Sequence, residues 1–217
     1  MRIIAGIARG RTIQAPEGMN TRPTLDRVRE NLFNMLQGRI TGSRVLDLFA
    51  GSGALSLEAI SRGAEHAVMA DRDRKASLCQ KKNIETLRFQ DRTEVITADW
   101  ATALKALKGA GRTFDLIFLD PPYRMNDLRE VFRELEDAAD EDALIIVEHE
   151  AGKPAAVPDT FEPVKERSWG YCGVTFYQKN PRRERRSRPD EQLRDPGILR
   201  PGDKRPHGNH PESGENL

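Results

Sequence analysis

The chain has 217 residues, a formal net charge of +1 and 37% hydrophobic residues, enough for one core of ordinary size. No apolar run approaches the length of a membrane span and no charged-then-apolar leader follows Met1, so we expect a soluble, cytoplasmic protein. Cys79 and Cys172 lie far apart, without a further thiol or histidine at ligand spacing, so neither a disulfide framework nor a zinc site is expected.

The first forty residues predict a short hairpin followed by a helix. Residues 2–6 and 10–14 form the two arms of the hairpin, and apolar side chains recur at helical spacing through 26–37. Thr24 stands where a capping residue would precede this helix. Arginines outnumber acidic residues by six to three in residues 1–30, which suits a polyanionic partner, although a solvated charged surface has the same composition.

Residues 41–179 alternate between predicted strands and helices. Strands are expected at 45–49, 66–70, 93–97, 114–119, 143–147, 161–167 and 174–178, and helices at 54–62, 75–88, 101–108 and 128–139. Strands joined through helices imply crossover connections and a mostly parallel sheet that is covered on both faces. Because no helix separates the last two strands, they should form an antiparallel edge. The expected fold is a doubly wound α/β fold with a seven-stranded sheet.

The composition changes at residue 180. Residues 182–188 contain five arginines and one glutamate, and prolines punctuate the sequence from there to residue 217. Such a segment has too little apolar surface to offset the entropy of ordering it. We therefore expect residues 180–217 to be a disordered tail.

Four aspartates fall at the carboxyl ends of the first four predicted strands: Asp47, Asp71, Asp99 and Asp120. In an open α/β sheet this is the edge at which ligands bind. Any one of them could simply cap the helix that follows. Four at the same edge favour a binding site.

The turn Gly51-Ser52-Gly53 allows the backbone to approach a ligand closely and begins a helix. It lacks the third glycine of a dinucleotide site, because position 56 is serine, and it lacks a P-loop lysine. Asp71 can accept hydrogen bonds from both hydroxyls of a ribose. Asp99 can accept one from an adenine amino group beside the Trp100 ring. In this order the three features predict an adenosine site without a pyrophosphate.

Asp120-Pro121-Pro122-Tyr123 follows the apolar strand at 114–119. The prolines stiffen the turn and remove two donors, so Asp120 and the Pro121 carbonyl are fixed acceptors for the two hydrogens of a planar amine. Tyr123 offers a ring on which a base can stack. Methyl transfer from a sulfonium to such an amine needs alignment rather than a metal or a covalent intermediate. The alternative is a Pro-Pro turn that ends an ordinary strand.

Two sets of motifs resemble known enzymes. VLDLFAGSGA at 45–54, Asp71, Asp99 and DPPY at 120–123 resemble the successive motifs of class I, Rossmann-like methyltransferases. RIIAG at 2–6, Arg9-Gly10-Arg11, RPT at 22–24 and LEAISRGA at 57–64 are similar to the RsmD family, which methylates the exocyclic amine of a guanine in bacterial small-subunit ribosomal RNA. The resemblance covers residues 1–178. Asp71 departs from it, since the family commonly has glutamate there.

The resemblance implies S-adenosylmethionine as the cofactor. Its methionine portion would contact Asp47, Phe49, Ala50, Gly51, Ser52 and Gly53, its ribose Asp71, and its adenine Asp99 and Trp100, while Asp120, Pro121, Pro122 and Tyr123 would hold the target guanine. The RNA-facing residues implied are Arg9, Arg11, Arg22, Thr24 and Arg29. The target base must leave its stack. The expected partner is 16S ribosomal RNA or a small-subunit assembly particle, with no metal, and nothing requires more than a monomer.

Other functions remain open. The same turn serves adenine and cytosine amines of DNA, and a related turn with asparagine serves glutamine side chains of proteins; aspartate at position 120 favours a base. A non-catalytic RNA-binding module with this fold is a further alternative. A magnesium-dependent phosphoryl-transfer or receiver-type domain would also place aspartates at strand ends, but residues 147–149 lack the lysine, serine or threonine it needs. Glu148 and His149 border the ligand edge and are given no role.

Overall fold

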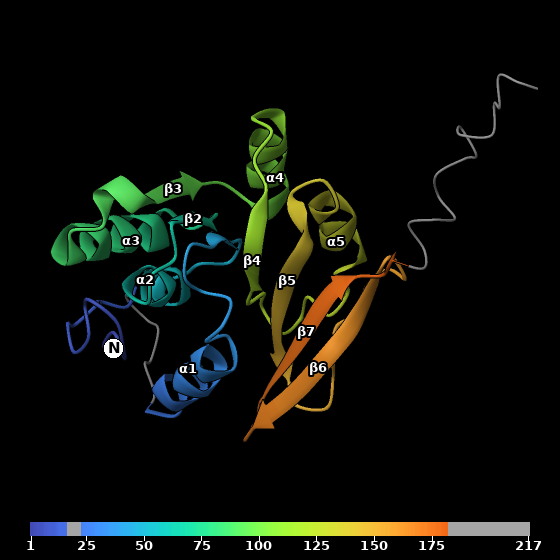
Figure 1. Ribbon diagram of the computed structural model, residues 1–217, viewed down its shortest axis with the longest axis horizontal. Helices are drawn as coiled ribbons and strands as arrows, with labels where there is room; N and C mark the ends of the chain where they lie inside the picture. The colour runs from blue at the N-terminus through green and yellow to red at the C-terminus, as the bar shows by residue number, and fades with distance from the viewer. Residues whose placement is uncertain (17–22, 182–217) are drawn as a thin grey trace, which may run out of the picture.

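One mixed sheet of seven strands runs through the part of the chain that the computed structural model describes, residues 1–16 and 23–181 (Figure 1). The strands are β1 (Arg44–Asp47), β2 (His66–Asp71), β3 (Thr93–Thr97), β4 (Phe114–Leu119), β5 (Ala139–Glu150), β6 (Phe161–Trp169) and β7 (Cys172–Lys179). The helices are α1 (Pro23–Met35), α2 (Ala54–Ser61), α3 (Arg74–Leu87), α4 (Trp100–Gly109) and α5 (Arg129–Leu135), with a short 3₁₀ turn at Gln90–Arg92.

The strand order is β3-β2-β1-β4-β5-β7-β6. Strands β1 to β5 pair in parallel, and β7 pairs antiparallel with both β5 and β6. This confirms the doubly wound α/β fold and its antiparallel edge. The direction of winding reverses between β1 and β4, and such a switch point leaves a crevice at the carboxyl ends of the strands.

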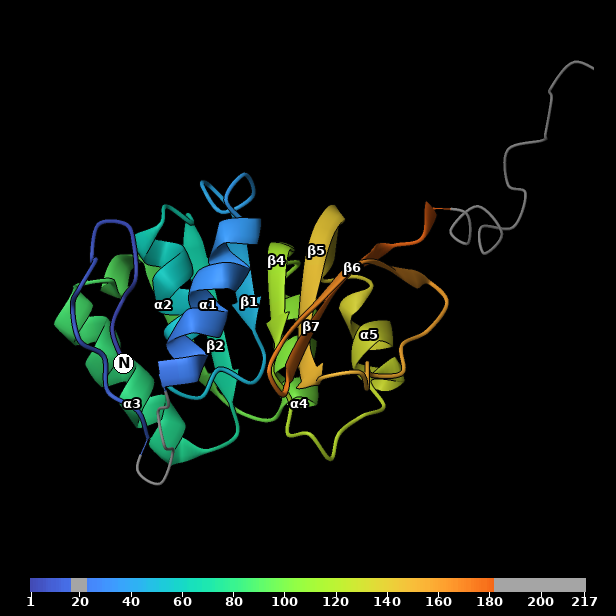
Figure 2. The same ribbon diagram turned by 90° about the horizontal axis from the view of Figure 1, so that it is seen from below.

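Apolar side chains alternate between the two faces of the sheet and build two cores. One core joins β-strand residues such as Val45 and Phe118 to helices α1, α2 and α3. The other joins Leu46 and Ile117 to α4 and α5. On the first face α1 lies alongside α2 (Figure 2). Since neighbouring residues of one strand serve opposite cores, both faces of the central strands are buried, as expected for a parallel sheet.

Several predicted boundaries differ from the structure, and two of these differences change what a residue does. Helix α1 begins at Pro23 rather than near Asp26, so Thr24 lies within the helix instead of capping it. Proline suits the first turn of a helix because its missing N–H has no partner there. Further along the chain, the helix predicted to reach Ala139 stops at Leu135. Ala139 instead pairs with Phe114 as the first residue of β5. This pairing draws residues 139–142 into the strand.

The N-terminal arms pair through the bridge Arg2–Thr12, which confirms a hairpin, but with shorter arms than predicted, because residues 5–10 form the turn. The hairpin is held on α2. The buried Glu58 carboxylate accepts the amides of Ile4 at 2.8 Å and Ala5 at 3.0 Å, and it pairs with Arg62 at 2.7 Å. Two stretches that identify the family resemblance, residues 2–6 and 57–64, are therefore the two sides of one contact.

Gly6 shows how close this contact is. Its φ is +84°, in the left-handed region, and a Cβ there would lie 1.8 Å from the Ser61 carbonyl oxygen. The Ser61 hydroxyl donates to the Ala5 carbonyl at 2.6 Å and accepts the Ala8 amide at 3.0 Å. Only glycine permits this approach of backbone to backbone.

Strand β6 is the exposed edge of the sheet. Between its ends, residues 162–168 are all exposed, whereas β7 beside it is buried for most of its length. The pairing of the two strands shifts register between Pro163 and Lys165.

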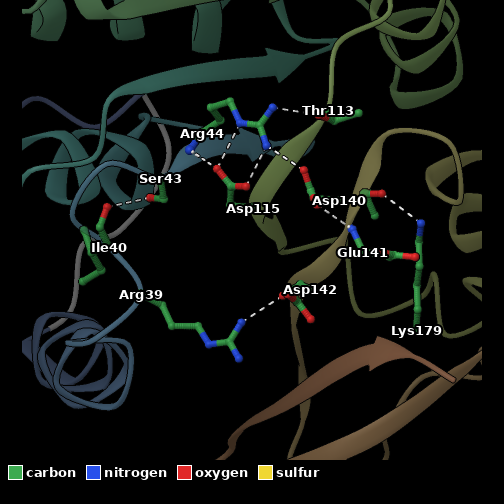
Figure 3. A network of polar contacts seen from close by, with 11 residues as sticks. Arg39, Ile40, Ser43, Arg44, Thr113, Asp115, Asp140, Glu141, Asp142 and Lys179 are labelled. Atoms are coloured by element: carbon green, nitrogen blue, oxygen red, sulfur yellow. Dashed lines mark hydrogen bonds and ion pairs between the residues drawn. The ribbon is translucent and has the colours of Figure 1, made fainter. Parts of the chain in front are cut away.

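Arg44 ties the amino ends of β1, β4 and β5 together (Figure 3). Its guanidinium donates to Asp115 at 2.7 and 3.1 Å, to Asp140 at 2.8 Å and to Thr113 at 2.7 Å. The network fixes the end of the sheet opposite the predicted ligand edge.

Replacing Arg44 with glutamine is expected to flatten the acid dependence of stability. The Arg44 hydrogen bonds hold the pKa of Asp115 below its ordinary value. Their stabilisation is therefore complete above the unfolded pKa and is lost as the pH falls below it and through the lower folded pKa. Because both groups are partly exposed, we expect an effect of about 1 kcal/mol or less. Urea denaturation at a series of pH values measures it, and equal pH slopes in both proteins would contradict it.

Candidate active site

A cavity of about 800 Å³ opens at the carboxyl edge of the sheet, where the winding reverses. It is bordered by the ends of β1, β2, β4 and β5, by the start of α4, and by Met1 and α1. Its volume is within the range of pockets that enclose a ligand of cofactor size. The four strand-end aspartates predicted from the sequence all line it: Asp47, Asp71, Asp99 and Asp120.

The glycine turn after β1 forms one wall of this cavity. Phe49, Ala50, Gly51 and Ser52 line it, whereas Gly53 is absent from its lining residues. Gly53 has a φ of +79°, and a Cβ there would lie 2.7 Å from the Met69 sulfur. The glycine is thus required by backbone conformation and by packing behind the turn.

Two buried side chains of α3 hold the turn from behind. Gln80 donates to the Gly51 carbonyl at 2.9 Å. Asn83 donates to the carbonyls of Ser52 and Gln14, each at 3.0 Å, and accepts the Gln14 amide at 2.8 Å. Asn83 therefore links the glycine turn to the N-terminal segment. We did not predict this link. The signal for it in the sequence is that Gln80 and Asn83 are polar residues three positions apart on the apolar side of α3.

Asp71 and Asp99 are also engaged by the protein. Asp71 accepts the amide of Gly51 at 2.9 Å and that of Asp73 at 2.8 Å. Asp99 caps α4, accepting the amides of Ala101 and Thr102 at 3.0 Å and the Thr102 hydroxyl at 2.9 Å, and these bonds lower the pKa of Asp99. Each carboxylate oxygen has two lone pairs, so both residues retain acceptor capacity toward the cavity.

Asp47 is the buried carboxylate of the cavity. Its Oδ2 accepts the Ser56 hydroxyl at 3.3 Å, whereas its Oδ1 has no hydrogen-bond partner in the described part of the chain. Burial raises the pKa of Asp47 to about 7. An unpaired buried acceptor is costly, so a ligand with a cationic or hydrogen-bonding group at this position would stabilise the ionised form.

The turn after β4 presents Asp120 to the cavity. Asp120 is exposed to the cavity, although the surrounding protein partly desolvates its carboxyl group. This desolvation, reinforced by the charges of Glu148 and Asp47, raises the pKa of Asp120 well above its ordinary value. Pro121 is buried, Tyr123 is 48% exposed, and the turn is closed by the Met125 amide, which donates to the Pro122 carbonyl at 2.7 Å.

Burial, and then the neighbouring Glu148, raise the pKa of the Tyr123 hydroxyl. Tyr123 is therefore neutral at physiological pH. An exposed neutral ring beside an acceptor-rich turn can stack on a base while the turn binds that base's amine.

The predicted RNA-facing arginines fall in different environments. Arg9 is exposed, and its side chain makes no hydrogen bond or ion pair with the residues described. Arg11 is exposed too, but it donates to the carbonyls of Thr86 and Leu87 at the end of α3. Arg22 lies outside the described residues, and the structure does not describe the side chain of Thr24.

The surface position expected for Arg29 is wrong. Only 5% of this residue is exposed, it lines the cavity, and its guanidinium donates to the Arg2 carbonyl and to Asp26. Burial lowers the pKa of Arg29, while the charges of Glu58 and Asp26 oppose this shift. The arginine is drawn inward because the N-terminal segment supplies a carbonyl and α1 and α2 supply the compensating carboxylates.

Cys79 and Cys172 are both free and buried. The residues described contain no group of three or more side chains suited to hold a metal ion. Nor do they include a helix long and apolar enough to cross a membrane.

The chain is similar to known proteins over most of its length. The family model described as conserved hypothetical protein 95 matches residues 1–178. The chain is 41% identical over 184 residues to ribosomal RNA small subunit methyltransferase D of Escherichia coli K12, covering 82% of this chain and 90% of that protein. The protein of that name from Haemophilus influenzae is 38% identical over 181 residues, covering 82% and 93%. The solved structure of yhhF from Escherichia coli matches with a TM-score of 0.70 and 38% identity, covering 83% of this chain and 98% of that one.

Proposed function

Because this chain belongs to the RsmD family, we propose that it transfers a methyl group from S-adenosylmethionine to the exocyclic amine of a guanine in 16S ribosomal RNA. The observation that carries this proposal is the meeting of two motifs in one cavity. The turn Asp120 to Tyr123 and the glycine turn after β1 border the same cavity, so a methyl donor and an amine held there would be neighbours.

The cavity suits S-adenosylmethionine, which supplies a methyl group on a good leaving group. The unpaired, buried Oδ1 of Asp47 suits the ammonium of the methionine portion, beside Phe49, Ala50, Gly51 and Ser52. Asp71 would accept the ribose hydroxyls, and Asp99 with Trp100 would border the adenine. Gly53 would act indirectly, by allowing the turn its shape.

Asp120 and the Pro121 carbonyl would hold the target amine. Accepting both amine hydrogens draws electron density onto the nitrogen and favours the tetrahedral geometry that it reaches as the new N–C bond forms. One N–H proton must then leave the methylated nitrogen. The raised pKa of Asp120 suits this carboxylate to take it.

The N-terminal segment, residues 1–40, would face the RNA, and residues 41–179 would form the catalytic domain. Arg9 is exposed and its side chain has no partner among the described residues, so it could contact a phosphate. Arg11 retains donors beyond the two carbonyls it serves. The attachment of the hairpin to α2 and α3 would keep this surface in a fixed position relative to the cavity.

Tyr123→Ala is expected to lower kcat/KM for RNA by about tenfold to a hundredfold, because base stacking contributes about 1–3 kcal/mol. Tyr123→Phe keeps the ring and should stay within about threefold of the wild type by the same argument. Steady-state kinetics with tritiated cofactor measure both. Equal losses in the two variants would assign the effect to the hydroxyl instead.

Mass spectrometry of ribosomal RNA from a strain that lacks this protein tests the function directly. One N2-methylguanosine of the small-subunit RNA should be absent, and purified protein with S-adenosylmethionine should restore it in naked RNA or in small-subunit particles. An unchanged RNA would overturn the proposal. Restoration in only one of the two substrates would identify the form that the enzyme recognises, and methylation of duplex DNA instead would favour the DNA alternative.

A further inference from the structure

Glu148 is a second carboxylate beside the DPPY turn, and no role has been given to it so far. Leu119 of β4 and Val147 of β5 are paired in parallel register, so Asp120 and Glu148 leave two adjacent strands side by side. Adjacent strands lie about 4.8 Å apart. Both side chains line the main cavity.

Glu148 also borders a smaller cavity of about 170 Å³. Pro121, Pro122 and Tyr123 of the DPPY turn line this second cavity as well. The two cavities meet at Glu148 and the turn. A base that stacks on Tyr123 and offers its amine to Asp120 would therefore have Glu148 next to its edge.

No ion pair holds the carboxylate of Glu148 among the described residues, and the charge of the neighbouring His149 only partly offsets the effect of its burial. The Tyr123 hydroxyl and the Cys172 thiol face this carboxylate. Burial raises the pKa of Glu148, and the negative charge of Glu148 in turn raises that of Asp120. Asp120, which opens on the cavity, and the half-buried Glu148 repel one another as adjacent carboxylates, and a ligand that brings two neighbouring donors would relieve this cost.

Guanine is the base that brings two such donors. Its exocyclic amine at C2 lies beside N1–H, so two N–H groups point from the same edge. The amine of adenine stands beside the N1 lone pair, and the amine of cytosine beside the N3 lone pair. A second carboxylate next to the amine-binding turn attracts N1–H and repels either lone pair.

We propose that Glu148 accepts a hydrogen bond from N1–H of the target guanine and so makes the site selective for guanine over adenine and cytosine. This inference rests on the proposed function, because it assigns the neighbouring amine to Asp120 and Pro121. It explains how a turn shared by enzymes that act on different bases can be restricted to one of them. The restriction comes from the next strand of the sheet rather than from the turn.

The test compares two RNAs with two proteins. The RNAs carry either guanine or 2-aminopurine at the target position; 2-aminopurine keeps the amine at C2 but has a lone pair at N1 and no oxygen at C6. The proteins are the wild type and Glu148→Gln, whose amide can donate to that lone pair. Glu141→Gln is the control, because it makes the same change at an exposed position near the other end of β5. Thermal melts of all variants establish that they fold.

The wild type should prefer guanine over 2-aminopurine by about tenfold to a hundredfold in kcat/KM, as expected for a hydrogen bond to a charged group. Glu148→Gln should reduce this preference to within about threefold, and Glu141→Gln should keep it. The 2-aminopurine RNA also lacks the oxygen at C6, and this difference affects both proteins alike. Comparing the guanine preference of the wild type with that of Glu148→Gln therefore cancels it.

A purely structural role of Glu148 would slow both RNAs equally and leave the preference intact, and this result would overturn the inference. The wild type alone provides a second test, which holds if Glu148→Gln fails to fold. Equal rates on the two RNAs would refute the role of Glu148 while leaving the methyltransferase assignment in place. Absence of methyl transfer to any RNA would instead overturn the proposed function and this inference together.

Discussion

Asp120→Ala is expected to lower the rate of methyl transfer by about a hundredfold to a thousandfold, the usual cost of removing one preorganised group that stabilises a transition state. In the proposed mechanism this side chain accepts one hydrogen of the amine. The Pro121 carbonyl accepts only the other hydrogen, so it cannot take over the role of Asp120. Asp120→Asn keeps one acceptor oxygen but cannot take up the released proton. It should therefore fall between the wild type and the alanine variant.

The same variants should bind the cofactor almost normally, because Asp120 stands at the end of β4 rather than on the glycine turn. Calorimetry with S-adenosylmethionine should give a dissociation constant within about threefold of the wild type, less than 1 kcal/mol. Asp127→Asn is a suitable control, since this carboxylate is exposed and pairs with Arg129. Transfer by Asp120→Ala at a rate near that of the wild type would show that the catalytic assignment is wrong.

Glu58→Ala is expected to reduce the free energy of unfolding by about 3–5 kcal/mol, the range observed when one partner of a buried ion pair is removed. The substitution leaves Arg62 without its carboxylate, and it leaves the amides of Ile4 and Ala5 without an acceptor. Urea denaturation measures the loss. Hydrogen exchange at those two amides should accelerate more than exchange in the central strands.

Two other variants make this prediction specific. Glu58→Gln keeps an acceptor for one backbone amide and should lose less stability than Glu58→Ala. Arg129→Ala removes an exposed pair and should leave the stability close to that of the wild type. If Glu58→Ala were no more destabilising than Arg129→Ala, the carboxylate would not be what attaches the hairpin to α2.

The order of strands and helices could be predicted because it depends on local patterns. Apolar runs of strand length and amphipathic stretches of helix length are visible in any window of the sequence, and the four strand-end aspartates share an edge by topology alone. The end of α5 could not be predicted in this way. Whether Ala139 continues a helix or begins a strand is decided by its pairing with Phe114, 25 positions earlier in the chain.

The partners of buried polar residues could not be predicted from local sequence patterns either. Arg29 looks like a surface cation, and Asn83 lies on the apolar side of α3 with no partner visible in the neighbouring sequence. Each is buried because a distant segment supplies a complementary group, the Arg2 carbonyl for Arg29 and the backbone of Gln14 for Asn83. Glu148 stood out only as a charge near the ligand edge, and its relation to Asp120 required the register of β4 and β5.

Strand β6 has a consequence for the behaviour of the protein at high concentration. An open sheet edge invites pairing with other molecules, and β6 opposes it with the charged side chains of Glu162, Lys165, Glu166 and Arg167 and with Pro163, which has no amide hydrogen to offer. Behind it, β7 is buried for most of its length and covers the apolar strand β5. The last hairpin therefore protects the sheet against aggregation, because a chain cut before β6 and β7 are complete would leave the edge of β5 unpaired.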